Sequence, residues 1–231
     1  NMHSVMNTNI SSFNFSEVRV EKMIEFLLSL NNSKSLDIYG INAEILKMAA
    51  YYIAEPLTIL YNKSLNQGYF PTLLKYAKIV PIHKKGERSD MNNYRPVAII
   101  PAFAKVFERL LNDDLIKYFE NNNYFSDSQF GFRKTRSTID AVTCLIGGCL
   151  CELEGGNLTH CKCYDLSRAF DTVSHDILVE KLRFYGFSCK AYDLVKSYLS
   201  ERSQYVSYDG NYSKFNSVKY GVPPFWDLLC S

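Results

Sequence analysis

Two short β-branched stretches, each containing a proline, are the feature that most constrains the fold. Residues 77–82 and 94–100 have the alternation of strands, and a polar loop over residues 83–93 joins them. Proline cannot donate a hydrogen bond within a sheet, so Pro81 and Pro96 favour edge positions. The pattern predicts two strands linked by a charged loop.

Segments of helical period make up much of the remaining chain. Helices are predicted over residues 20–28, from residue 45 toward residue 68, and over residues 103–115, 137–150, 174–185 and 192–199. Ser16 is placed to cap the first helix, and Pro56 should break or kink the second. The fourth helix should begin at Ser137, with Asp140 three residues on as its capping partner.

Strand signals also occur in the second half of the chain. Residues 159–166 predict a buried strand, and the Asp209-Gly210 pair between alternating runs predicts a hairpin over residues 204–218. Helices, a hairpin, further helices, a strand and a second hairpin follow one another. This order indicates an α+β fold.

Charge is nearly balanced overall but unevenly distributed. The 231 residues carry 26 Lys and Arg against 24 Asp and Glu, a net charge of +2 that excludes a histone-like or strongly acidic protein. Residues 75–95 nevertheless hold six basic and two acidic side chains, and residues 129–139 hold three basic and no acidic ones. Two basic patches in a mildly acidic remainder are typical of local phosphate binding.

Cysteine usage and hydropathy bear on the compartment. Seven cysteines, without the grouping of a disulfide framework, favour a reducing environment, and no secretory segment opens the chain. The apolar, uncharged stretch at residues 141–151 is too short to span a bilayer and is interpreted as a core helix. We therefore expect a protein that is not secreted and has no membrane partner. Because residue 1 is Asn, we expect the sequence to start inside a longer product.

Asp165 is the first candidate for chemistry, because it directly follows the predicted strand at residues 160–164. A strand end holds a carboxylate rigidly, and Mg²⁺ prefers oxygen ligands. The alternative is an ordinary turn former or helix cap.

Several blocks together are more specific than this aspartate. They are Ala77-Lys-Ile-Val-Pro-Ile-His-Lys-Lys-Gly86, Asn93-Tyr-Arg-Pro-Val97, Lys105-Val-Phe-Glu108, Gln129-Phe-Gly-Phe-Arg-Lys134 with Ser137-Thr138, Asp165-Leu-Ser-Arg-Ala-Phe-Asp171 and Gly221-Val-Pro223. In this order they resemble the reverse transcriptase domain of non-LTR (LINE-type, jockey-like) retrotransposons, from about Ile24 to Pro223.

The resemblance implies a fold and an activity. The fold is the fingers and part of the palm of a right-hand polymerase. The activity is RNA-directed DNA polymerisation, in which two Mg²⁺ ions support transfer of dNTPs to the 3′-hydroxyl of a DNA primer on an RNA template. The family also suggests nucleus and cytoplasm as the location, whereas the oligomeric state stays open.

The same resemblance assigns roles around the reaction centre. Asp165 and the carbonyl of Leu166 match the Mg²⁺ ligands, with Asp165 as the catalytic aspartate. Phe170 matches the gate beside the incoming sugar, although a core aromatic is equally natural there. Asp171 is left unassigned, with a helix cap as its ordinary role.

Phosphate and template contacts are implied in the two basic patches. Arg95 matches the arginine that grips the triphosphate, and Lys84 and Lys85 lie in the loop that assists it, although these lysines would also suit a solvated turn. Which lysine contacts phosphate is undecided. Phe132 and Arg133 resemble residues that line the template path.

The C-terminus departs from the family pattern. The family continues after Gly-Val-Pro with Gln-Gly-Ser and later carries an Ala-Asp-Asp hairpin, whereas residues 224–231 read Pro-Phe-Trp-Asp-Leu-Leu-Cys-Ser. We interpret this as a frameshift or gene-model error after Pro223, which leaves the C-terminal palm and the thumb missing. The expected organisation is a lead-in at residues 1–20, the reverse transcriptase domain at 21–223 and an aberrant tail at 224–231. Because Asp165 alone cannot hold two Mg²⁺ ions, we expect an inactive fragment.

Two other functions remain as alternatives. One is a nucleic-acid-binding module derived from a reverse transcriptase that uses the basic patches without chemistry. The other is a zinc-stapled domain using Cys149, Cys151, Cys161 and Cys163, although these pairs lack the usual two-residue gap. His83 and His175 have no obvious partners and are interpreted as solvated positions.

Overall fold

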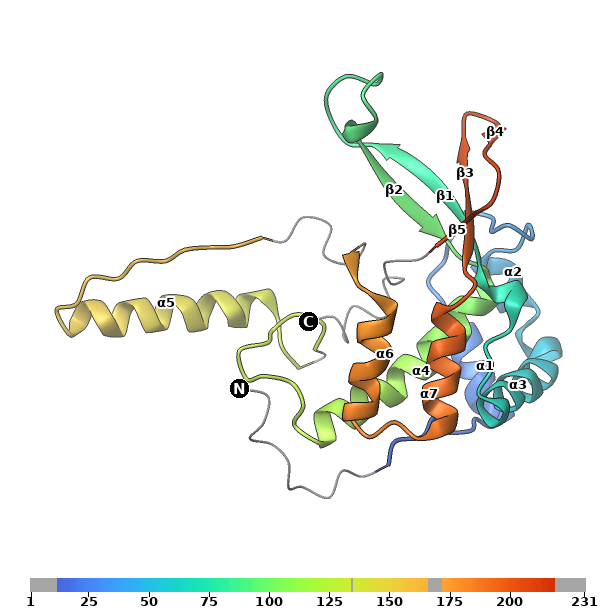
Figure 1. Ribbon diagram of the computed structural model, residues 1–231, viewed down its shortest axis with the longest axis horizontal. Coiled ribbons are helices and arrows are strands. Elements are labelled where there is room, and N and C mark those ends of the chain that lie inside the picture. Colours follow the sequence, from blue (N-terminus) through green and yellow to red (C-terminus); the bar gives the residue numbers. More distant parts are fainter. Residues whose placement is uncertain (1–11, 134, 166–171, 219–231) are drawn as a thin grey trace.

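A computed structural model describes residues 12–133, 135–165 and 172–218 (Figure 1). The elements in chain order, with η for a 3₁₀ helix, are α1 (Val20–Leu28), α2 (Ala43–Met48), α3 (Ala50–Gln67), η1 (Thr72–Lys75), β1 (Tyr76–His83), η2 (Met91–Asn93), β2 (Tyr94–Ile99), α4 (Ala102–Asn121), α5 (Thr138–Glu154), α6 (His175–Phe184), α7 (Cys189–Leu199), β3 (Ser203–Tyr208), β4 (Asn211–Tyr212) and β5 (Asn216–Ser217). The mixture of helices and a sheet confirms the α+β prediction at this coarse level.

One sheet joins two hairpins that are distant in sequence. Its order is β2-β1-β3-β4, and β5 also pairs with β3, on the side away from β1. β1 and β2 are antiparallel with Pro81 opposite Pro96, whereas β3 joins β1 in parallel over Tyr76–Ile79 only. At Pro81 and Pro96 the sheet therefore consists of β1 and β2 alone, so each proline can turn its nitrogen, which has no hydrogen to donate, away from the neighbouring strand. This agrees with the edge positions predicted for both prolines.

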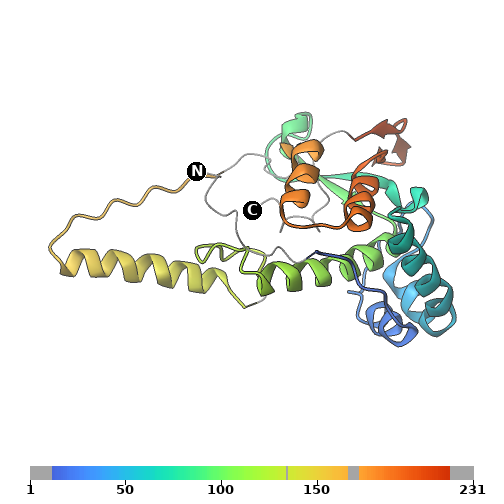
Figure 2. The same cartoon turned by 60° about the horizontal axis from the view of Figure 1, so that its bottom comes forward.

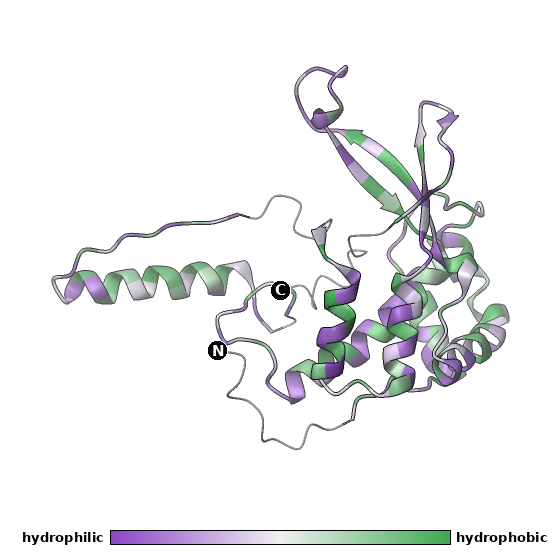
Figure 3. Ribbon diagram, in the orientation of Figure 1, coloured by the Kyte–Doolittle hydropathy of each residue, from purple (hydrophilic) through white to green (hydrophobic). Residues whose placement is uncertain are grey.

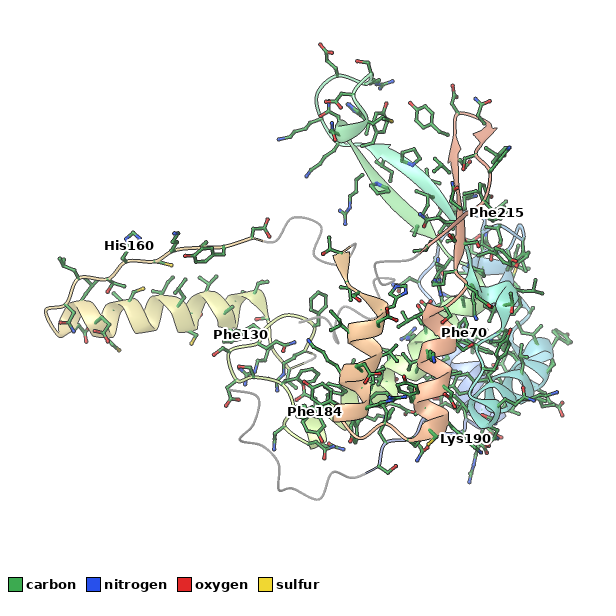
Figure 4. All side chains as sticks on the ribbon, viewed as in Figure 1. Phe70, Phe130, His160, Phe184, Lys190 and Phe215 are labelled. Carbon is green, nitrogen blue, oxygen red and sulfur yellow. The ribbon has the colours of Figure 1, made fainter. Side chains whose placement is uncertain are left out.

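The core lies below the sheet, among the helices. The ring of Phe107 in α4 lies edge-on to the rings of Tyr61 in α3 and Phe70, with distances between ring centres of 5.1 and 6.1 Å. The ring centre of Tyr198 in α7 lies 4.8 Å from that of the same Phe70. Figure 4 shows Phe70 among these helices. Edge-to-face contacts of this kind add to the free energy gained from burying the rings. The core thus holds α3, α4 and α7 together beneath the hairpins.

A buried aspartate fixes the connection from β2 to α4. One carboxylate oxygen of Asp37 accepts hydrogen bonds from the backbone N–H of Tyr39 and Ile41, at 2.8 and 2.9 Å. The other oxygen accepts from the N–H of Ala102 at 2.8 Å, at the first residue of α4. Asp37 therefore satisfies a free donor at the N-terminus of α4 from a distant loop.

Two features of the predicted helices differ in the structure. α3 continues through Pro56, so the predicted break at this proline is wrong. Proline has no N–H for the carbonyl four residues earlier in the helix, and because Pro56 is exposed this carbonyl can bond water instead. The helical segment is interrupted earlier, at Ala49, which lies between α2 and α3. α1 begins after Arg19 without a side-chain cap, while Ser16 instead donates its backbone N–H to Asp114 Oδ2.

The fourth predicted helix forms, but it is not a core helix. Ser137 and Asp140 make the predicted capping box at the start of α5. None of the residues of α5 is buried, and the helix extends away from the other helices in both views (Figures 1 and 2). Its apolar residues, coloured green along the ribbon in Figure 3, therefore expose their side chains to solvent, because no other described segment covers them. No helix in the described ranges is long and apolar enough to cross a membrane.

The predicted buried strand is also wrong where it can be compared. Residues 159–165 have no sheet partner among the described residues, and their side chains are exposed. This segment runs back along α5 instead (Figure 1). The hairpin at Asp209-Gly210 is confirmed, with Ser207 opposite Tyr212 and both turn residues at positive φ.

Candidate nucleotide and nucleic-acid interface

Hydrogen bonds within the loop between β1 and β2 hold it in one conformation. The backbone N–H of Lys84 donates to the carbonyl of Asn93 at 2.8 Å, and Asn93 Nδ2 donates to the carbonyl of Glu87 at 2.9 Å. The hydroxyl of Tyr94 donates to the carbonyl of Arg88 at 3.0 Å. The loop is thus fixed by its own residues and presents its side chains from a defined backbone.

Four positive side chains at the loop end of this hairpin are free in the part of the chain that the structure describes. Lys84, Lys85, Arg88 and Arg95 are exposed, and none has a side-chain hydrogen bond or ion pair with the residues the structure describes. A ligand can therefore bind these charges without first breaking an ion pair within the protein. Unpaired cations on a rigid hairpin suit a phosphate chain.

His83 lies at the base of this loop rather than in open solvent. It is the last residue of β1 and is half-buried, with its ring 5.3 Å from that of Tyr94. Its Nε2 is 3.0 Å from the carbonyl oxygen of Gly86. His83 therefore supports the turn, which the sequence interpretation as a solvated position did not anticipate. His175 is the first residue of α6 and is half-buried.

Replacing Gly86 by alanine is expected to distort the loop and weaken polyphosphate binding at least tenfold. Gly86 has a φ of +83°, and an added Cβ would lie 2.6 Å from Asn93 Nδ2. The strain and the clash would displace the side chain that holds Glu87. Titration with inorganic triphosphate measures the loss. Gly156→Ala is the control, since Gly156 has a φ of +78° but open space around it, and equal loss in both variants would contradict the role of the loop.

The second basic patch is largely neutralised. Arg133 makes a two-pronged ion pair with Glu120, with Nη2–Oε2 at 2.8 Å and Nε–Oε1 at 3.1 Å, and its side chain is 11% exposed. Arg136 bonds Asp127. Phe132 is half exposed, with a φ of +61°. The template role of Phe132 and Arg133 stays a prediction, and the ion pair gives Arg133 a role in fixing the loop.

Asp165 is an exposed carboxylate at the end of the segment beside α5. Within the described ranges it makes no hydrogen bond or ion pair, and no contact joins it to Arg95. The same ranges contain no group of three His, Cys, Asp or Glu side chains that could hold a metal ion. The described residues therefore do not by themselves fit the two-Mg²⁺ site. Leu166 and Phe170 lie outside the described residues, as does Asp171.

The cysteines do not support the zinc alternative. The six described cysteines are free thiols, and they are absent from any metal-holding group of the described residues. Cys163 lies close enough to Cys161 to raise the pKa of the Cys161 thiol, and Cys149 has a weaker effect in the same direction. The described residues therefore offer no group of ligands for the zinc alternative.

Sequence reasoning missed the contact that joins the tips of the two hairpins. The rings of Tyr94 in β2 and Tyr208 in β3 lie 5.8 Å apart, and their hydroxyl oxygens are 3.2 Å apart. This hydrogen bond is the largest cause of the raised pKa of Tyr94. No local pattern links residues so far apart in the chain, because the contact depends on the parallel pairing of β1 with β3.

Comparisons with known proteins show the family of the chain. Residues 82–224 match the family described as reverse transcriptase (RNA-dependent DNA polymerase). The chain is 31% identical over 207 residues to a probable RNA-directed DNA polymerase from transposon BS of Drosophila melanogaster, covering 89% of the chain and 23% of that relative.

Two further relatives come from other mobile elements. The RNA-directed DNA polymerase from mobile element jockey of Drosophila melanogaster is 33% identical over 168 residues, covering 72% of the chain and 18% of the relative. The Pol polyprotein from the type-1 retrotransposable element R1 of Bradysia coprophila is 32% identical over 108 residues, covering 46% of the chain and 11% of the relative. The chain thus spans less than a quarter of the length of these relatives. It belongs to the reverse transcriptase family, in the group of non-LTR retrotransposon polymerases.

Proposed function

We propose that this chain forms the fingers and part of the palm of an RNA-directed DNA polymerase that extends a DNA primer on an RNA template. The observation that carries the proposal is the β1–β2 hairpin, which presents Lys84, Lys85 and Arg88 on an internally bonded loop and Arg95 on β2. None of these four cations has a side-chain partner among the described residues. The triphosphate of an incoming dNTP is the substrate group that such a hairpin suits. Family membership makes a dNTP the natural candidate.

Within this proposal the hairpin residues have different tasks. The planar guanidinium of Arg95 can bond two phosphate oxygens at once, whereas Lys84 and Lys85 act as compact positive charges. Charge neutralisation and positioning are the main requirements of phosphoryl transfer. The hairpin would therefore both hold the nucleotide and draw negative charge away from the reacting phosphorus.

The metal part of the proposal rests on the sequence match. Asp165 would be one carboxylate ligand and the carbonyl of Leu166 a second oxygen, with Phe170 beside the sugar. Two Mg²⁺ ions need more oxygen ligands than the described residues gather around Asp165. We therefore expect the 231-residue polypeptide not to extend a primer.

A salt titration tests the nucleic-acid part of the proposal. The wild-type polypeptide is expected to bind an RNA template annealed to a DNA primer with an affinity that falls steeply with salt, because binding releases counterions from phosphates. Electrophoretic mobility shift at several salt concentrations measures this. A salt-independent affinity, or incorporation of dNTP in the same mixture, would contradict the account.

A binding module without chemistry is the second candidate, favoured by the lack of a metal-binding group among the described residues. It would bind nucleic acid with the same salt dependence. It would have no reason to bind a free dNTP, so nucleotide affinity separates the two functions.

A further inference from the structure

A row of four aromatic rings lies on the side of the sheet that carries Arg95. Phe215, which follows β4, has its ring 5.5 Å from that of Tyr76 and 5.1 Å from that of Tyr205, and Tyr205 lies 6.0 Å from Tyr212. Figure 4 places Phe215 beside β3. The row thus crosses the sheet from β1 through β3 to β4.

Strand register puts this row and Arg95 on one face. Lys78 pairs with Tyr205 between β1 and β3, and Ser207 pairs with Tyr212 between β3 and β4. Arg95 of β2 pairs with Ile82, four residues after Lys78 and therefore on the same face of β1. A ligand that follows this face meets the rings and the free guanidinium in turn.

The outer rings are not needed for the core. Tyr212 is 70% exposed and Phe215 is 55% exposed, and neither belongs to the buried cluster. Phe215 meets its neighbours at interplanar angles of 69° and 73°, so the rings are not stacked face to face on one another. Two hydrogen bonds between Val206 and Ser213, at 2.8 and 2.9 Å, fix the chain just before Phe215.

We propose that Tyr212, Phe215 and the neighbouring rings stack the bases of a single-stranded polynucleotide that leads along the sheet toward the β1–β2 hairpin. Lys214, between the two outer rings, is exposed and has no side-chain partner among the described residues, so it can neutralise a phosphate. Aromatic rings beside unpaired cations are the usual platform for single strands, because every base offers a ring face. The inference rests on the proposed function and adds the surface that guides the unpaired strand.

The test is the affinity of the full chain for a labelled oligouridylate, measured by fluorescence anisotropy. Tyr212→Leu combined with Phe215→Leu keeps apolar side chains but removes the rings, and should weaken binding at least tenfold. The slope of affinity against salt should stay unchanged, since no charge is lost. Tyr212→Phe keeps a ring and should therefore retain most of the affinity that the single variant Tyr212→Leu loses. The matched control is Tyr52→Leu, which removes the ring of an 87% exposed tyrosine in α3.

The outcomes separate this inference from the proposed function. Unchanged affinity in the double variant overturns the stacking surface while leaving the hairpin proposal intact. Absence of any binding by the wild-type chain overturns both. If sedimentation shows a wild-type dimer that the double variant dissociates, the face belongs to a second copy and the inference is wrong. Competition between oligouridylate and oligothymidylate tells whether the bound strand is RNA or DNA, and either preference supports the platform.

Discussion

Replacing Arg202 by methionine is expected to lower the free energy of unfolding by about 3–5 kcal/mol at pH 8, and by clearly less at pH 5. Arg202 lies between α7 and β3 and is 5% exposed. Its guanidinium lies 4.8 Å from the centre of the Tyr198 ring, and its Nη1 donates to the carbonyl of Tyr198 at 3.3 Å. It is therefore a buried charge held by specific partners.

The partner that makes the effect depend on pH is Glu108 of α4. Glu108 is 4% exposed and accepts a hydrogen bond from the hydroxyl of Tyr198 at 2.7 Å. Burial raises the pKa of its carboxyl to about 7, against opposing effects of Arg202, Tyr198 and Lys105. Without Arg202, an ionised Glu108 would lose its principal counter-charge in the core.

The sign of the pH dependence follows from this raised pKa. The native state binds the Glu108 proton more tightly than the unfolded chain, whose carboxyl titrates near 4.5. The stabilisation from this proton is fully present below about pH 4.5 and is lost as the pH rises through about 7. At pH 5 the Glu108 carboxyl is largely neutral, so loss of Arg202 leaves little uncompensated charge there.

Urea unfolding at pH 5 and pH 8 measures this prediction. Glu108→Gln keeps an acceptor for Tyr198 and should remove most of the pH dependence. The double variant Glu108→Gln with Arg202→Met should lose less stability at pH 8 than the two single changes added together. An Arg202→Met loss that is equal at both pH values, or additive with Glu108→Gln, would contradict coupling between the two residues.

Local signals predicted much of the fold, and long-range contacts explain the errors. The Ser137–Asp140 capping box and the Asp209-Gly210 turn depend on neighbouring residues, and both are confirmed. The parallel pairing of Tyr76–Ile79 with Ser203–Val206 joins distant segments and has no local signature. That pairing places the aromatic residues of β3 and β4 on the face of β1 that also carries Arg95, so the aromatic row was not predictable.

The exposure of α5 shows a second limit. Its apolar residues have the period of a helix that packs against something, and the sequence was interpreted accordingly as a core helix. Hydrophobic periodicity predicts the helix and its apolar face but does not specify what covers that face. In the described residues nothing does. The same limit explains why residues 159–166 were expected to form a buried strand.

Loss of Arg95 is expected to weaken binding of a deoxynucleoside triphosphate by about 10- to 100-fold, the range for charge-assisted hydrogen bonds. Arg95 is exposed on β2, with no internal ion pair to break among the described residues. Its side chain can therefore be truncated without unfolding the hairpin. Arg95→Lys keeps the charge but loses the two-pronged geometry, so an intermediate affinity is expected.

Controls make this result specific to the phosphates. Arg183→Ala removes another exposed arginine, 60% exposed on α6, and should leave nucleotide affinity unchanged. Lys84→Gln and Lys85→Gln, made separately, should show which lysine assists Arg95. A monophosphate should bind the wild-type chain and Arg95→Ala with similar weak affinity, because it lacks the phosphates that the hairpin is proposed to hold.

The most direct test of a triphosphate-binding hairpin is calorimetric titration of the wild-type chain and Arg95→Ala with dATP in the presence of Mg²⁺. The account predicts measurable wild-type binding that falls at least tenfold in Arg95→Ala and stays unchanged in Arg183→Ala. Equal affinity of the wild-type chain and Arg95→Ala for dATP would contradict it.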